Sequence, residues 1–282
     1  MNLDVAGLQE IRLRAEQPAV ILSHGKEYVS QTVIHRRQLE ETLAYLGNYS
    51  LYAYKEEIKQ GYITIEGGHR VGVAGQTVLV DGKIAGISPI TFLNIRIAHE
   101  KCGCARKILP LIRQKNSIYN TLILSMPGAG KTTLLRDSIR ALSNGEAYGI
   151  RLKVCVVDER SEIAASFHGV PQNDMGPRTD VMDGCGKAEG MQLLIRSMSP
   201  QIIAVDELGA ESDFYAVEQA LNCGSRVLGT IHAGNMKELS EKPYLKRWME
   251  RRLFQRFIFL EKETNGRRKM QVYDEHMERI TC

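Results

Sequence analysis

The stretch SMPGAGKT, from Ser125 to Thr132, has the residue types of a loop that binds phosphate groups. The usual pattern for such a loop is GxxxxGK[ST], placed between a strand and a helix. Here Ser125 replaces the first glycine, at a position that mainly needs a small residue. The remaining glycines allow backbone N–H groups to converge on phosphate oxygens, and the helix that follows adds its dipole. This stretch therefore predicts a nucleotide-binding site.

Two side chains of this loop have separate expected roles. Lys131 brings a point charge to the β- and γ-phosphate oxygens, and the Thr132 hydroxyl binds Mg²⁺. The chain has no NKxD motif, which reads a guanine base, so ATP is favoured over GTP. The expected cofactors are ATP and Mg²⁺. The residues expected to contact the nucleotide are Pro127, Gly128, Ala129, Gly130, Lys131, Thr132 and Thr133.

A phosphate loop also needs a carboxylate at the end of a neighbouring strand, and the stretch QIIAVDE supplies two. Asp206 is expected to hold Mg²⁺, directly or through water. Glu207 is expected to polarise the attacking water, either as a general base or by orienting it. The adjacent Asp-Glu pair is typical of a hydrolase rather than of a small-molecule kinase.

Two further strand ends carry polar side chains. The stretch VCVVDERSEI contains Glu159, and VLGTIHAGN ends with His232 and Asn235. In a doubly wound sheet, the ends of neighbouring strands open into one crevice. We therefore expect Glu159 and His232 to face the same nucleotide as the Asp-Glu pair. His232 would either sense the γ-phosphate or link that event to a neighbouring subunit.

The bulk properties of the chain limit the classes of protein to which it can belong. Its 282 residues suit one or two domains, and its composition is ordinary for a soluble globular protein. The net charge of +4 is compatible with anionic ligands but is no signature of nucleic-acid binding. No apolar run is long enough to span a bilayer, and the N-terminus is too polar for a signal peptide, so a cytoplasmic location is expected. The six cysteines lack zinc-site spacing and are interpreted as reduced thiols.

The pattern of apolar residues predicts two domains. Residues 1–100 mix short strands with helices, as in a small α+β domain. Residues 101–118 are expected to form a connecting helix or linker. In residues 119–282, near-continuous apolar strands alternate with helices, which predicts an α/β domain with a parallel-rich central sheet covered on both faces. Its tail, residues 256–275, is interpreted as a hairpin with Asn265-Gly266 at the tip.

The order of these motifs resembles that of the secretion-type ATPases of the RecA-like class, the motors of type II and type IV secretion and of pili. Their phosphate loop, Asp box, Walker B strand and His box are similar to MPGAGKTT, VVDERSE, MSPQIIAVDE and GTIHAGN. The block from Asn173 to Gly209 resembles more closely the stage III sporulation protein AA family of endospore-forming bacteria. LQEIRLRAEQP, GGHRVGVAG and LNIRIAHEKCGCA fit the N-terminal region of that family, so the resemblance covers nearly the whole chain.

The resemblance implies a RecA-like P-loop ATPase domain preceded by a smaller α+β N-terminal domain. It also implies a homo-oligomer, a hexameric ring, that hydrolyses ATP as the motor of a secretion-like channel complex required for endospore formation. The motor would couple hydrolysis to assembly or transport at the forespore membrane. Its partners would be membrane-embedded sporulation channel proteins, and it would be cytoplasmic, peripheral to the membrane on the mother-cell side. One departure is that many secretion ATPases have Gly-Glu where this chain has Asp206-Glu207.

ATP in a ring motor usually lies between subunits, and an arginine of the neighbour then stabilises the charge on the transferring phosphoryl group. The candidates are Arg70, Arg96, Arg178 and Arg196. In secretion ATPases the N-terminal module packs against the neighbour's nucleotide, so the resemblance favours Arg96 and Arg70. Arg178 lies in a glycine-bounded loop and would contact either the same nucleotide or the pore of the ring.

Two other functions compete with the ATP-hydrolysing motor. A nucleic-acid-dependent RecA-like ATPase agrees with the mild basicity, but no aromatic stacking platform or dense basic stripe is evident, so nucleic acid is not expected as a partner. A non-hydrolysing nucleotide-binding scaffold is opposed by the presence of Lys131, Asp206 and Glu207. We therefore favour the motor.

Overall fold

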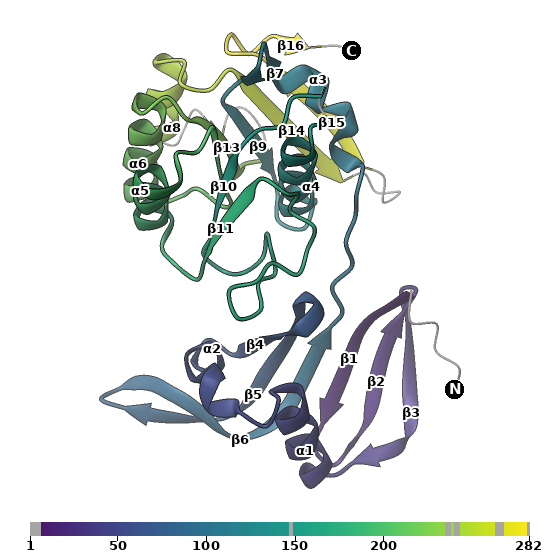
Figure 1. Cartoon of the computed structure of the whole chain (residues 1–282). Coiled ribbons are helices and arrows are strands. Elements are labelled where there is room, and N and C mark those ends of the chain that lie inside the picture. Colours follow the sequence, from purple (N-terminus) through teal and green to yellow (C-terminus); the bar gives the residue numbers. More distant parts are fainter. Residues whose placement is uncertain (1–6, 147–148, 235–237, 240–242, 263–267, 281–282) are drawn as a thin grey trace. The chain divides into compact units, whose positions relative to one another are not determined.

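The computed structural model of the chain divides it into two units (Figure 1). Unit 1 comprises residues 1–100 and 165–172, and unit 2 comprises residues 101–164 and 173–282. Each unit has a sheet and a hydrophobic core of its own. The residues that the structure describes are 7–146, 149–234, 238–239, 243–262 and 268–280.

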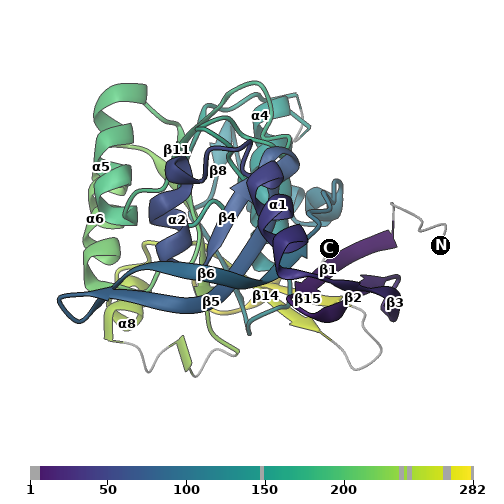
Figure 2. The same cartoon turned by 90° about the horizontal axis from the view of Figure 1, so that it is seen from below.

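Unit 1 is built on a six-stranded antiparallel sheet. Its strands are β1 (Leu8–Arg14), β2 (Gln17–Ser23), β3 (Lys26–Ile34), β4 (Tyr62–Ile65), β5 (His69–Val80) and β6 (Lys83–Arg96). They lie in the order β3-β2-β1-β6-β5-β4. The helical segments are α1 (Arg36–Leu46), α2 (Lys55–Lys59) and the 3₁₀ turns η2 (Leu51–Tyr54) and η3 (Glu66–Gly68). Figure 2 shows α1 and α2 on the same face of this sheet.

Alternating side chains explain why the helices cover one face of this sheet, because successive residues of a strand point to opposite sides. In β6, Leu93 and Ile95 are buried in the core, while Phe92, the residue before Leu93, is exposed on the opposite face. Leu39 and Leu43, one turn apart on α1, belong to the same buried cluster. The apolar residues of the strands and of the helices are thus buried together in one core between the sheet and the two helices.

Unit 2 contains an eight-stranded sheet in which six consecutive strands are parallel and two antiparallel strands complete one edge. In spatial order the strands are β11 (Thr179–Asp183), β10 (Val154–Asp158), β12 (Ile202–Val205), β13 (Arg226–His232), β9 (Thr121–Ser125), β14 (Arg256–Lys262), β15 (Arg268–Tyr273) and β16 (Arg279–Ile280). The α/β fold with a parallel-rich sheet, preceded by a smaller α+β unit, is confirmed. β14 and β15 form the tail hairpin, whose expected tip at Asn265-Gly266 lies outside the described residues.

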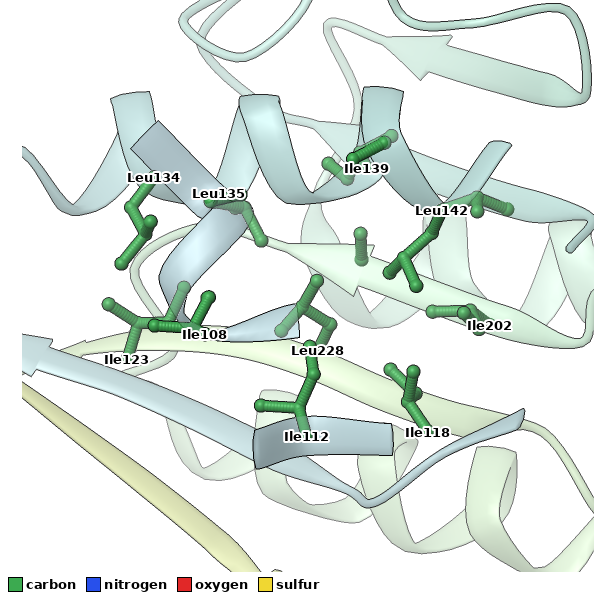
Figure 3. Packing of buried hydrophobic residues seen from close by; sticks show 14 of the residues in the cluster. Ile108, Ile112, Ile118, Ile123, Leu134, Leu135, Ile139, Leu142, Ile202 and Leu228 are labelled. Atoms are coloured by element: carbon green, nitrogen blue, oxygen red, sulfur yellow. The ribbon is translucent and has the colours of Figure 1, made fainter. Parts of the chain in front are cut away.

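Both faces of this sheet are buried, because its central strands are apolar at nearly every position. The helices in contact with it include α4 (Lys131–Asn144), α5 (Lys187–Met198), α6 (Glu211–Asn222) and α8 (Pro243–Glu250). Figure 3 shows one face, where Ile123, Ile202 and Leu228 of three strands lie near Leu135 and Ile139 of α4. On the other face, the strands pack with α5, α6 and α8. No helix in the described part of the chain is long and apolar enough to cross a membrane.

The segment 101–118, where a connecting helix is expected, is mostly not helical. It contains the 3₁₀ turn η4 (Cys104–Lys107), the single turn α3 (Leu109–Ile112) and the short antiparallel pair β7 (Arg113–Gln114) and β8 (Ser117–Ile118). Pro110 lies in the first turn of α3, where its missing N–H is tolerated. Ile108, Ile112 and Ile118 are buried in the unit 2 core. The apolar residues of this segment therefore pack as part of unit 2.

Two features of the chain between β10 and α5 carry no local sequence signal. β11 is an edge strand with half-exposed residues, so its polar sequence is typical of a loop. Residues 165–172, in the same stretch, belong to unit 1, where Phe167 packs against the core. Only contacts between residues far apart in the sequence determine either feature.

Asp137 in α4 connects the start of unit 2 to the helix that follows the phosphate loop. Its buried carboxylate accepts hydrogen bonds from the backbone N–H of Ala105 at 2.7 Å and from the Arg140 guanidinium at 2.9 and 3.0 Å. Arg140 also pairs with Glu146. Burial raises the pKa of Asp137, but these hydrogen bonds outweigh it and hold the pKa below its usual value. The carboxylate is therefore charged and paired inside the core.

Removal of the Asp137 carboxylate should destabilise unit 2, because it leaves the buried Arg140 charge without one of its partners. We expect Asp137→Ala to lower the free energy of unfolding by about 3 kcal/mol or more, the usual cost of breaking a buried ion pair from one side. Trp248 is the single tryptophan of the chain and is buried in unit 2. Its fluorescence during urea unfolding therefore reports this unit.

The matched control is Glu261→Ala, which removes one partner of the exposed pair between Glu261 and Lys269. Exposed pairs contribute about 0–1 kcal/mol, so this variant should unfold almost as the unmodified chain does. Equal effects of the two substitutions would contradict the argument from burial.

Candidate functional site

The phosphate loop lies between β9 and α4, in the context that the sequence predicts. β9 is buried along its whole length, and α4 begins at Lys131. Gly128 and Gly130 have φ angles of +77° and +102°. This left-handed conformation would cost most other residues about 1–2 kcal/mol. Gly130 provides no side-chain cap for α4, so the first backbone N–H groups of the helix can donate to a phosphate.

The carboxylate of Asp206 joins three elements around this loop. Its Oδ2 accepts a hydrogen bond from the Thr132 hydroxyl of α4 at 2.6 Å. Its Oδ1 accepts from the Thr230 hydroxyl of β13 and from the backbone N–H of Glu207, the latter at 3.1 Å. Because β12 and β13 are parallel neighbours, their carboxyl ends bring these groups to one edge of the sheet. The bonds hold α4 and both strand ends together.

A chain of hydrogen bonds runs from the phosphate loop along this edge. Lys131 Nζ lies 3.0 Å from His232 Nδ1, and His232 Nε2 lies 2.8 Å from Glu207 Oε1. Arg160 Nη1 lies 3.2 Å from the other oxygen of Glu207. An ammonium group only donates hydrogen bonds, so Nδ1 of His232 accepts and Nε2 carries the proton that Glu207 accepts. Asn235, the other polar residue expected here, lies outside the described residues.

Burial and neighbouring charges shift the pKa values along this chain of groups. Lys131 is only 6% exposed, and burial lowers the pKa of its ammonium group. Burial also raises the pKa of Glu207, but the hydrogen bond from His232 and the charges of Arg160 and Lys131 outweigh it and lower that pKa. Glu207 is therefore an ionised carboxylate with a fixed orientation, the state that a general base requires.

Asp158, at the end of β10, anchors the loop of residues 159–164. Its buried carboxylate accepts hydrogen bonds of 2.8–3.0 Å from the backbone N–H groups of residues 162–164. Arg136 of α4 donates to two carbonyl oxygens of the same loop. Burial raises the pKa of Asp158 to about 6, although these hydrogen bonds oppose the shift. Asp158 therefore fixes the shape of the loop.

The loop and the strand ends enclose a polar pocket. Its lining residues are Asp158, Glu159, Arg160, Glu162, Lys187, Asp206 and Glu207. Glu159 forms an ion pair with Lys187 at the start of α5. The structure thus brings Glu159, Asp206 and Glu207 to one pocket, with His232 bonded to Glu207. The catalytic roles of these residues stay predictions.

Arg160 and Lys187 are pocket residues to which the sequence reasoning assigned no role. Arg160 directly follows Glu159, so its place in an acidic strand end is a signal that could have identified it. Lys187 reaches the pocket because α5 packs beside β10 and β11, and no local pattern indicates that packing.

The candidate arginines are distributed over both units. Arg70 and Arg96 belong to unit 1 and lie directly opposite each other on β5 and β6. The Arg70 guanidinium lies 3.7 Å from the centroid of the Tyr62 ring. In unit 2, Arg178 directly precedes β11, and Arg196 is exposed in the last turn of α5. Their predicted role, contact with the nucleotide of a neighbouring subunit, stays a prediction.

The oxygens of Thr132 and Asp206 provide the type of ligand that Mg²⁺ prefers, and they adjoin the phosphate loop. The described residues contain no group of three or more His, Cys, Asp or Glu that could hold a metal by itself. Mg²⁺ sites in nucleotide enzymes use one or two protein carboxylates and take their other ligands from phosphates and water. The residues present therefore fit a Mg²⁺ ion that arrives with a nucleotide.

The parallel sheet, the phosphate loop after β9 and the carboxylates after β12 define the class of the protein: a P-loop domain with the RecA-like fold. The profile of the family described as "Sporulation stage III, protein AA" matches residues 1–280, and the chain belongs to this family. It is 41% identical over 267 residues to Stage III sporulation protein AA of Bacillus subtilis (strain 168), across 95% of this chain and 87% of that protein.

Solved structures of ATPases share the fold at low sequence identity. The ATPase DotB of Legionella pneumophila is 18% identical, with a TM-score of 0.59 over 95% of this chain and 76% of that one. The pilus retraction motor PilT, solved with bound ADP, is 16% identical, with a TM-score of 0.64 over 95% of this chain and 78% of that one. These likenesses support the RecA-like ATPase fold, and at this identity they concern the fold alone.

The raised pKa of Asp158 predicts a pH dependence of stability. The pKa is about 6 in the folded chain, against an ordinary value of 3.8. Between these values the folded state binds more protons than the unfolded state, so this group lowers the free energy of unfolding as the pH rises from about 4 to about 6. The total change should be about 3 kcal/mol, because one pKa unit corresponds to about 1.4 kcal/mol.

Urea unfolding of the unmodified chain and of Asp158→Asn, followed by Trp248 fluorescence over this pH range, measures the effect. The asparagine does not titrate, so the stability of the variant relative to the unmodified chain should increase as the pH rises. A difference that is independent of pH would show that Asp158 keeps an ordinary pKa in the folded state.

Proposed function

We propose that this chain is a Mg²⁺-dependent ATPase that works as a hexameric ring in a secretion-like channel complex of endospore formation. Hydrolysis drives assembly or transport at the forespore membrane. The observation that carries this proposal is the hydrogen-bonded network of the phosphate-loop residues Lys131 and Thr132 with Asp206, Glu207 and His232. Membership of the sporulation family supports the cellular process.

ATP binds with its β- and γ-phosphates against the phosphate loop and the uncapped N-terminus of α4. The contacting residues are Pro127, Gly128, Ala129, Gly130, Lys131, Thr132 and Thr133. Lys131 leaves the neutral imidazole of His232 and binds a phosphate oxygen, since an ammonium group binds an anionic acceptor more strongly than a neutral one. Thr132 and Asp206 hold Mg²⁺, which neutralises charge that develops on the phosphates.

Glu207 positions the attacking water and accepts its proton. The water oxygen bonds to the γ-phosphorus while the bond from that phosphorus to the bridging oxygen breaks, which gives ADP and inorganic phosphate. His232 orients Glu207 through Nε2–H and contacts Lys131 through Nδ1, so it senses whether a γ-phosphate is present. Glu159 faces the same nucleotide from the end of β10.

In the ring, Arg96 and Arg70 act on the nucleotide of the neighbouring subunit. Residues directly opposite each other on adjacent strands lie on the same face of the sheet, so both guanidinium groups belong to one face of unit 1. The partners of the ring are membrane-embedded channel proteins of sporulation. The ring docks on them at the cytoplasmic face of the membrane, on the mother-cell side.

ATP hydrolysis by the purified chain is the first test of this function. We expect Mg²⁺-dependent release of phosphate, and a loss of about 10²-fold or more in kcat for both Lys131→Ala and Glu207→Gln. Lys131→Ala removes the charge beside the phosphates, and Glu207→Gln removes the proton acceptor. Phosphate release is measured beside light scattering, which gives the mass of the assembly in the same samples.

Lys153→Ala is the matched control, because it removes an exposed lysine of the same unit. Full activity in Glu207→Gln would rule out its role as the base. Single-stranded DNA should leave the rate unchanged, whereas stimulation that falls steeply with salt would favour a nucleic-acid-dependent ATPase.

Subunit mixing tests whether Arg96 acts on a neighbour. Lys131→Ala and Arg96→Ala should each be nearly inactive alone, since an arginine at the transferring phosphoryl group is worth about 10³–10⁵ in kcat. Mixed rings should regain part of the activity, because some interfaces then combine an intact Lys131 with an intact Arg96. Phosphate release after mixing over a range of ratios measures this recovery.

The control for mixing is Arg37→Ala, which changes an arginine of α1 with a side chain 89% exposed and should be fully active alone. Mixed rings without any recovery, in samples where light scattering verifies assembly, would show that Arg96 does not act across an interface.

A further inference from the structure

Arg160 is a residue of the polar pocket that the proposed function leaves without a role. It lies in the loop after β10, directly after Glu159. Its guanidinium donates a hydrogen bond to Glu207 Oε2 at 3.2 Å, and its side chain is 64% exposed. The group that Arg160 contacts is therefore the carboxylate assigned to the attacking water.

The backbone around Arg160 is held in place, while its side chain can move at little cost. Asp158 accepts three backbone N–H groups of this loop, and Arg136 binds two of its carbonyl oxygens. The ion pair with Glu207, in contrast, is exposed on the arginine side, and such pairs contribute about 0–1 kcal/mol. A ligand with greater negative charge than one carboxylate can therefore attract the guanidinium away from Glu207.

The charges of the pocket lining indicate what this guanidinium does. The lining contains five carboxylates and two cationic groups, and a triphosphate adds further negative charge. Lys187, one of the two cations, is 15% exposed and paired with Glu159. Arg160 is the other, and it combines exposure with a position beside Glu207.

We propose that Arg160 is a catalytic residue of its own subunit. Its guanidinium moves away from Glu207 and stabilises the negative charge on the transferring γ-phosphoryl group. This inference rests on the proposed ATPase function of the same site. As the water oxygen bonds to the γ-phosphorus, the electron pair of the breaking bond goes to the bridging oxygen of ADP, and Glu207 takes the water proton. The departure of Arg160 also frees Glu207 Oε2 to bind that water.

The exchange has a consequence for the site without nucleotide. Both oxygens of Glu207 are then engaged, one by His232 and one by Arg160. Glu207 becomes available to water when a γ-phosphate attracts Arg160. The same arginine therefore restrains the resting site and promotes the reaction once ATP is bound.

Steady-state kinetics of Arg160→Ala in the full-length chain test this inference. We expect kcat to fall about 10³-fold, in the range known for arginines that stabilise this transition state, with KM changed by less than about threefold. The complex of ADP with aluminium fluoride, which imitates the transferring phosphoryl group, should lose affinity, while ADP alone should bind as before. Millimolar guanidinium, far below denaturing concentrations, should restore part of kcat.

Arg160→Lys retains the charge without the guanidinium geometry and should give an intermediate kcat. Arg151→Ala is the control, since it removes an exposed arginine of the same unit and should leave kcat unchanged. Thermal unfolding of each variant verifies that the chain is folded.

An unchanged or increased kcat in Arg160→Ala, while Lys131→Ala is inactive, would overturn the role of Arg160 and leave the ATPase function intact. An increase in KM with kcat unchanged would overturn it also, because it would assign Arg160 to binding of the ground state. Absence of hydrolysis by the unmodified chain would instead overturn the proposed function on which the inference rests.

Discussion

The carboxylate of Asp206 is the group on which the geometry of the site depends. It accepts hydrogen bonds from the hydroxyls of Thr132 and Thr230, and so joins the helix after the phosphate loop to the ends of β12 and β13. The next residue, Glu207, has a φ of +51°, a left-handed conformation that is uncommon outside glycine and costs about 1–2 kcal/mol. Its backbone N–H donates a hydrogen bond to Thr230 Oγ1 at 2.8 Å, which stabilises this turn. The strained turn directs the Glu207 side chain toward His232.

The polar and charged side chains at this edge of the sheet satisfy one another's hydrogen bonds. Lys131 bonds to His232, His232 to Glu207, and Glu207 to Arg160. Lys131, which is only 6% exposed, would otherwise be a poorly solvated charge beside the buried core. A ligand must therefore exchange partners rather than fill an empty site. In the proposed function, nucleotide binding therefore separates Lys131 from His232 and Arg160 from Glu207.

The sequence predicts the parts of this molecule that follow from short-range patterns. The phosphate loop, the buried parallel strands and the carboxylates after β12 each combine a local motif with a local element, and the fold class follows from their order. β11 and Lys187 could not be predicted in this way, because an edge strand and a helix packed beside it depend on long-range contacts. The sequence predicts a connecting helix or linker in residues 101–118, whereas burial of Ile108, Ile112 and Ile118 in unit 2 determines the shape of this segment.

Unit 1 includes residues 165–172, which are synthesised after the first strands of unit 2. Phe167 packs against the core of unit 1, and the Gly67 N–H donates a hydrogen bond to the Gln172 side chain at 2.9 Å. When the first hundred residues leave the ribosome, their core still lacks this piece. β9 and β10 are made before it, and β11 and β12 after it. The two units therefore cannot mature strictly one after the other, as separate domains usually do during synthesis. The sheet of unit 1 can form from residues 8–96 alone, but the packing of Phe167 and the hydrogen bond of Gln172 are added only after the middle of unit 2 has been translated.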